Sequence, residues 1–118
     1  MNKYSDKSDF EINKAVTEEL TQSGFIIGIE YHDKHILITD KYANHYPFDP
    51  CNNPADAMPI IIENKICMAY DVFAEEHDGG NWVAQPAYGF SDERVRSDNY
   101  YRAAMEVFLM MKDAENES

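Results

Sequence analysis

The sequence predicts an α+β domain of about four antiparallel strands, arranged in two hairpins and covered by two or three helices. Three patterns support this fold class. Apolar residues recur at helical spacing near both ends of the chain, β-branched segments lie between them in pairs, and short polar segments separate the strands of each pair. The expected order of elements is helix, hairpin, helix, hairpin, helix, and we expect the two hairpins to form a single sheet.

A single domain is expected, because two domains within 118 residues would each be near the smallest size that sustains a core. Hydrophobic residues make up 44% of the chain, which is ample for a folded interior. The two polar ends, residues 1–7 and 113–118, are expected to be disordered tails.

The first helix is expected to begin at Ser8, which with Glu11 has the spacing of a capping box. Gly24 offers a left-handed stop at its other end. The apolar stripe of this helix consists of Ile12, Ala15, Val16 and Leu20. Segments 25–31 and 35–39 then form the first hairpin, with the polar residues 32–34 as its turn.

Residues 42–52 have neither helical nor strand periodicity, and we expect a loop there that is pinned by Tyr46 and Phe48. The second helix begins with Asn53 as N-cap and Pro54 at its first position, and it extends to about Asn64.

Residues 66–73 and 81–84 form the second hairpin, joined by a turn over 75–80. The last helix is expected to open at Ser97 or Asp98. One face of it is apolar and carries Tyr101, Ala104, Met105, Phe108 and Met111 or Lys112.

The formal net charge of −12 disfavours direct binding to nucleic acid. The nearest thing to a basic cluster is Arg94, Arg96 and Arg102, and acidic residues surround it. An acidic surface suits contact with a basic protein, or imitation of a nucleic acid before a protein that binds one. Solubility is the simpler explanation of the same charge.

The chain has neither an apolar signal segment at its start nor an apolar run of about 20 residues. We therefore expect a cytoplasmic protein that makes no contact with the membrane. Cys51 and Cys67 are the only cysteines, and we expect both to be reduced thiols.

The loop before the second helix is the best candidate ligand-binding site, with Cys51, Asn52, Asn53 and Asp56 as its residues. A helix N-terminus attracts anions and can lower the pKa of a nearby thiol, which makes Cys51 the better candidate nucleophile. Catalysis would also need a histidine beside it, and His45 is only a neighbour in sequence. Catalysis is therefore disfavoured, and Cys67 is interpreted as a buried structural cysteine.

Other chemistry has weaker support, and no cofactor or metal is expected. A metal site would need the fold to bring together His32 and His35 with His45 or His77. The simpler interpretation is that these histidines are solvated. The acidic segment 71–78 lacks the regular ligand spacing of a calcium loop. Nucleotide-binding glycine motifs are missing.

Trp82, Tyr88 and Phe90 form a candidate interaction surface, since aromatic side chains supply a large contact area at low entropic cost. Packing in the core is the alternative use of these residues.

Residues 8–14, 51–61 and 102–111, taken together in order and spacing, resemble the NinX-like family of lambdoid phages and prophages. Residues 53–56 show a weaker similarity to phage proteins named for an α-β-α sandwich. The NinX-like resemblance implies an accessory phage protein from a family without established chemistry, and it brings no catalytic residues to carry over.

Two functional hypotheses follow. The first is a non-enzymatic accessory protein that acts by contact with a host or phage protein. The alternative is a small-molecule or anion binder, or a minor enzyme, that uses the loop before the second helix.

Overall fold

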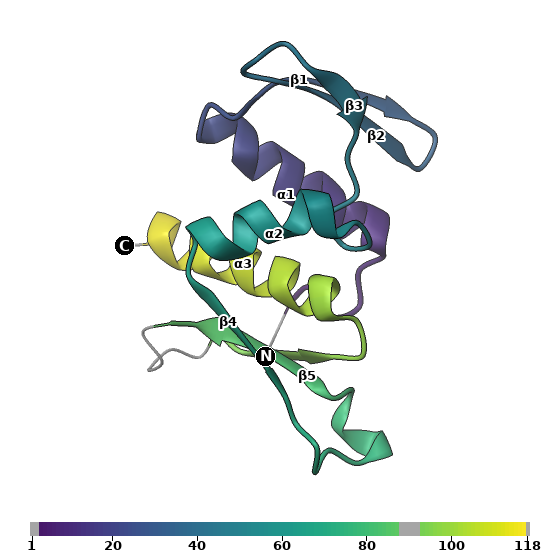
Figure 1. Cartoon of the computed structure of the whole chain (residues 1–118), viewed down its shortest axis with the longest axis vertical. Helices are drawn as coiled ribbons and strands as arrows, with labels where there is room; N and C mark the ends of the chain where they lie inside the picture. The colour runs from purple at the N-terminus through teal and green to yellow at the C-terminus, as the bar shows by residue number, and fades with distance from the viewer. Residues whose placement is uncertain (1–2, 88–92, 118) are drawn as a thin grey trace.

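Two small antiparallel sheets lie on opposite sides of a layer of helices (Figure 1). The computed structural model describes residues 3–87 and 93–117. The first sheet has the order β1 (Ile26–His32), β2 (His35–Asp40) and β3 (His45–Pro47). The second has the order β4 (Ile66–Tyr70), β5 (Trp82–Pro86) and β6 (Val95–Ser97). The predicted α+β class is confirmed.

The first two helices begin where the sequence places their caps, and the last one begins later. In α1 (Asp9–Gln22), the Ser8 hydroxyl accepts from the Glu11 amide and completes the capping box. In α2 (Pro54–Glu63), the Asn53 side chain accepts from the Ala55 amide. The last helix, α3 (Tyr100–Glu117), opens later than predicted, because the Asn99 side chain accepts from the amides of Tyr101 and Arg102.

The core surrounds α3. Residues 103–109 of this helix are all buried, which means that neighbours cover every side of it. It packs against α1 and α2 on one side and against β4, β5 and β6 on the other, while α1 covers β1 and β2. The single apolar face predicted for this helix therefore understates its burial, because Ala103, Val107 and Leu109 are also buried.

The predicted strand count and sheet arrangement are corrected by the structure. Each hairpin gains a third strand, β3 beside β2 and β6 beside β5, and the two hairpins form separate sheets where a single sheet was expected. Both added strands have three residues, too few for a strand periodicity to be visible in the sequence. Strand β3 lies inside the expected loop 42–52. The layers run sheet, helices, sheet, the reverse of an α-β-α sandwich (Figure 1).

The described parts of the two ends that were expected to be tails contact each other. Tyr4 is 8% exposed, and its hydroxyl contacts the Asp113 carboxylate. Lys3 forms an ion pair with the same carboxylate at 3.2 Å, and α3 continues to Glu117. The N-terminal segment thus lies along the last helix.

Candidate functional site

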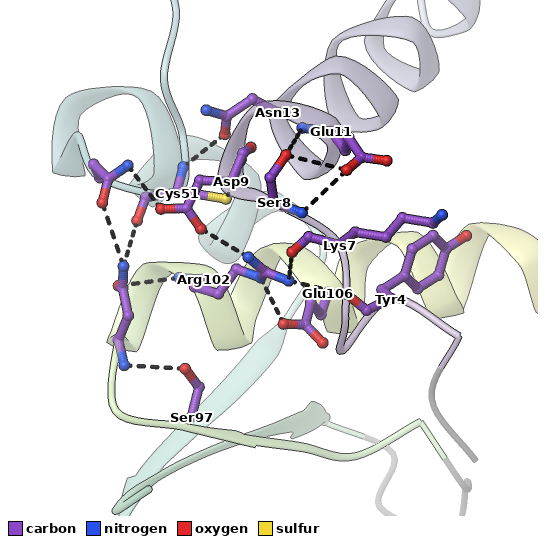
Figure 2. A network of polar contacts seen from close by, with 12 residues as sticks. Tyr4, Lys7, Ser8, Asp9, Glu11, Asn13, Cys51, Ser97, Arg102 and Glu106 are labelled. Atoms are coloured by element: carbon purple, nitrogen blue, oxygen red, sulfur yellow. Dashed lines mark hydrogen bonds and ion pairs between the residues drawn. The ribbon is translucent and has the colours of Figure 1, made fainter. Parts of the chain in front are cut away.

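The loop before α2 lies where the N-terminal ends of α1 and α3 approach it, and a network of polar contacts joins the three segments (Figure 2). From α1, the Asn13 side chain donates to Asp49 at 2.6 Å and accepts from the Cys51 amide at 3.0 Å. Just before α3, the Asn99 side chain donates to the Cys51 carbonyl at 3.0 Å. The loop is therefore held from both sides.

Arg102 completes this network from α3 and is nearly buried, with 12% of its side chain exposed (Figure 2). It binds the carboxylates of Asp9 at 2.7 Å and Glu106 at 2.6 Å. It also donates to the backbone carbonyls of Tyr4 at 3.0 Å and Lys7 at 2.7 Å. One guanidinium thus fixes the N-terminal segment and the start of α1 against α3.

Cys51 is wholly buried in this network, with no exposed surface. Burial raises the pKa of its thiol well above the ordinary value of 9.0, and the negative charge of Asp9 adds to the increase. The predicted lowering of this pKa by the dipole of α2 was therefore wrong in direction. A buried thiol held in its neutral form is a poor nucleophile.

The other residues of the predicted ligand-binding loop are also engaged within the protein. The Asn52 side chain donates to Asp9 and to Asp49, each at 3.2 Å. Asn53 caps α2, and Asp56 accepts from the Asp49 amide at 2.9 Å. Burial raises the pKa of Asp56, against the effect of that hydrogen bond. The structure does gather these residues, and these contacts stabilise the loop. Ligand binding there stays a prediction.

The sequence analysis missed Asn13, Asn99 and Arg102, which organise this region. A signal for Asn13 was available, because it is a polar residue beside Ile12 on the buried side of α1, where it is only 6% exposed. Arg102 and Glu106 have the i,i+4 spacing of a helical ion pair, which the sequence shows. Asp9 and the carbonyls of Tyr4 and Lys7 are far from Arg102 in sequence, and no local pattern connects them to it.

Cys67 was predicted to be buried, and this was wrong. It lies on β4, pairs with Gln85 of β5 and is exposed. Side chains alternate between the two faces of a sheet, and Cys67 follows the buried Ile66, so it lies on the face of β4 away from the core.

Trp82 lies in the second sheet, opposite Tyr70 of β4. Its ring makes edge contacts with Tyr70 and with Tyr100 of α3, each at a centroid distance of 4.9 Å. Trp82 is half-buried and connects the sheet to α3. The other two residues of the predicted interaction surface, Tyr88 and Phe90, lie outside the described residues.

Histidines lie apart from this network. His32 and His45 each approach Glu30 at 3.7 Å on the exposed side of the first sheet. Within residues 3–87 and 93–117, no three His, Cys, Asp or Glu side chains are grouped so that they could hold a metal ion. In the same residues, every helix is too short or too polar to cross a bilayer.

A cavity of about 400 Å³ opens on the other side of α2, between the C-terminal parts of α1 and α3. Aromatic and aliphatic side chains, including Phe25, Phe48, Ile60 and Phe108, contribute to its wall. Charged groups also line it, among them Asp56, Lys41 and Lys112. Asp56 is the one residue of the predicted ligand-binding loop that reaches this cavity.

These features define a small acidic α+β domain in which buried polar side chains tie helix ends together. A family model described as "Bacteriophage P22, NinX" matches residues 3–112. The chain therefore belongs to the bacteriophage P22 NinX family, and the predicted NinX-like resemblance is confirmed. No curated protein and no solved structure matches it.

Proposed function

We propose that this phage protein acts in the cytoplasm of the host cell as a non-enzymatic accessory factor, through contact with a basic surface of a host or phage protein. The observation that carries the proposal is the net charge of −12 on a chain of this size. Complementary fields accelerate and orient the encounter of two proteins, and they need no catalytic group.

The placement of the charges supports contact with a protein over contact with nucleic acid. Of the three arginines, Arg96 is paired with Asp71 at 3.0 Å, and Arg102 with Asp9 and Glu106. Acidic side chains are exposed on several elements, for example Glu18 on α1, Glu30 on β1 and Glu63 at the end of α2. A phosphate backbone would meet a repulsive field over much of this surface.

The test is affinity copurification of the tagged full chain from host lysate over a salt series, with bound proteins identified by mass spectrometry. An unrelated protein of similar size and net charge serves as the control, because any acidic bait retains abundant basic proteins. A partner retained by this chain alone, and lost as salt rises, is expected. If the bound proteins match those of the control bait at every salt concentration, the proposal fails.

A second candidate function, binding of a small molecule, is favoured by the cavity beside α2. Its volume of about 400 Å³ lies within the usual range for ligand pockets, and its wall combines aromatic side chains with a few charged ones. A thermal-shift screen with host metabolites tests it. A true ligand should raise the melting temperature, and Lys41→Ala should reduce that shift while Lys34→Ala, remote on the β1–β2 turn, leaves it unchanged. A screen without a stabilising metabolite counts against this function.

A further inference from the structure

The connection between β4 and β5 projects beyond the helices at the end of the molecule formed by the second sheet (Figure 1). It contains the short helix η1 (Glu76–Asp78). Three large apolar side chains are exposed on this projection or beside it: Phe73 is 88% exposed, Val72 69% and Tyr70 54%. We call these three residues, with the acidic residues Glu75, Glu76 and Asp78, the hairpin tip.

The backbone that presents Phe73 is held in place by several contacts. The Asp71 carboxylate accepts from the Phe73 amide at 2.9 Å and pairs with Arg96 at 3.0 Å. These two contacts also keep the pKa of Asp71 below its ordinary value. Arg96 donates in addition to the Gly80 carbonyl, and the Asn81 side chain donates to the Asp71 carbonyl at 3.0 Å. The base of the hairpin tip is thus anchored to β6.

Among the exposed apolar side chains, that of Tyr70 is also supported by other rings. Tyr70 packs edge-on against Trp82, which packs in turn against Tyr100 of α3. An aromatic residue held out to solvent on an anchored loop loses little conformational entropy when a partner covers it. Aromatic anchors of this kind, inserted into a pocket, supply much of the affinity in protein interfaces.

Charge decides which partner fits. Exposed acidic side chains follow Phe73 within five residues of the chain: Glu75, Glu76 and Asp78. His77, which lies among them, pairs with Glu75 and Asp78. A second copy of the chain would bring a further net charge of −12 toward these carboxylates. An anionic lipid surface would repel them for the same reason. A basic protein surface is attracted.

The geometry points to the hairpin tip as the docking surface for a protein with an apolar pocket rimmed by Lys or Arg, with Phe73 as the side chain that enters the pocket. This inference rests on the proposed function, for which it names the contact surface and the kind of partner. It also relocates the interaction surface predicted around Trp82, which here supports Tyr70 from beneath.

The experiment places a photo-crosslinking benzophenone amino acid at position 73 of the full chain, expressed in host cells that carry the phage genes. A matched chain carries the same probe at position 42, since Tyr42 is 70% exposed but lies at the β2–β3 turn in the other sheet. The expected result is a protein adduct formed from position 73 and not from position 42. Peptide mapping should place the adduct in an apolar site with Lys or Arg beside it.

The purified partner then gives an affinity measurement. Phe73→Ser is expected to weaken binding by at least about tenfold, whereas Tyr42→Ser leaves the affinity within about twofold. Glu76→Lys should lower the association rate several-fold at low salt, and Glu63→Lys on α2 should not. Phe73→Ser should keep the melting temperature of the wild type, because the side chain buries almost nothing within the chain.

The outcomes separate this inference from the proposed function. If the wild-type chain captures a salt-sensitive partner and Phe73→Ser retains it unchanged, contact with a protein stands and the hairpin tip is not its surface. The inference is also overturned if the adduct at position 73 is with a second copy of the chain. Binding to anionic vesicles that is lost in Phe73→Ser would overturn it as well. If no specific partner is captured from the lysate and no adduct forms at position 73, both proposals fail.

Discussion

At the scale of single residues, the structure reverses the roles expected for the two cysteines. Cys51 has no exposed surface and lies among side chains from α1 and α3, whereas Cys67 is exposed on an edge strand. The role of each cysteine was predicted from its neighbours in sequence. Burial of a single thiol depends on segments far away along the chain, so local sequence could not decide it.

The two thiols should therefore react with very different rates. In the native protein, a thiol reagent such as Ellman's reagent is expected to modify one thiol quickly, and Cys67→Ser should remove this fast phase. Cys51 should react only after denaturant is added, because its thiol is buried and kept protonated. Fast labelling of both cysteines in the folded wild-type chain would contradict the structure.

Arg102 is the residue whose loss should affect stability most. Arg102→Ala leaves Glu106, whose side chain is 6% exposed, without this cation, and it removes one donor from each of the carbonyls of Tyr4 and Lys7. Breaking such a pair from one side costs roughly 3 kcal/mol of unfolding free energy, and the half-exposed Asp9 keeps the loss from being larger.

Urea denaturation measures this loss. Arg102→Lys is the matched variant: it retains the charge but lacks the planar set of donors, so an intermediate loss is expected. If Arg102→Ala unfolds at the same urea concentration as the wild type, the network contributes little to stability.

At the scale of elements, the caps and turns follow from local chemistry. The capping box at Ser8, the Asn53 cap and the turn between β1 and β2 all lie where the sequence predicted them. These features depend on residues within a few positions of one another, so they are visible without the fold. Strands β3 and β6 were missed, because a three-residue strand is specified by the neighbour to which it pairs.

Gly80 and Gly24 both have positive φ, and comparing them tests how closely Gly80 approaches β6. A Cβ at Gly80, where φ is +130°, would lie 2.2 Å from the Ser97 carbonyl carbon. At Gly24, where φ is +86°, a Cβ would meet no atom within 4 Å.

Gly24→Ala should therefore cost about 1–2 kcal/mol from backbone strain alone. Gly80→Ala should cost more, because the backbone of Ser97 and Asp98 cannot move aside without disturbing β6. Thermal unfolding of the two variants gives the comparison. Equal losses would mean that the approach of Gly80 to β6 is looser than the structure has it.

At the scale of the whole molecule, charge affects folding and binding in opposite ways. A net charge of −12 destabilises the compact chain through self-repulsion, and added salt screens it. The unfolding free energy should rise as ionic strength increases from about 0.01 M to about 0.15 M, where the screening length falls from about 30 Å to about 8 Å. Binding to a basic partner should weaken over the same range.

Both trends can be measured with the same samples, by urea denaturation and by titration of the purified partner. Potassium chloride is a suitable salt, because it screens charge with little effect on the hydrophobic contribution. A stability that falls with added salt would mean that attractive pairs such as Arg102 with Asp9 outweigh the net repulsion.

The sequence by itself determined the α+β class, the order of the three helices and two hairpins, the caps of α1 and α2, and membership of a phage family. The fold class, the order of elements and the caps follow from composition, spacing and short-range chemistry, whereas the family follows from resemblance to known sequences. The tertiary structure decided that the helices lie between two separate sheets, that α3 is enclosed, that Arg102 joins distant segments, and that Phe73 is exposed. These features share one physical reason. Burial and ion pairing depend on which distant segments of the chain meet, and the local sequence of one segment does not show its partners.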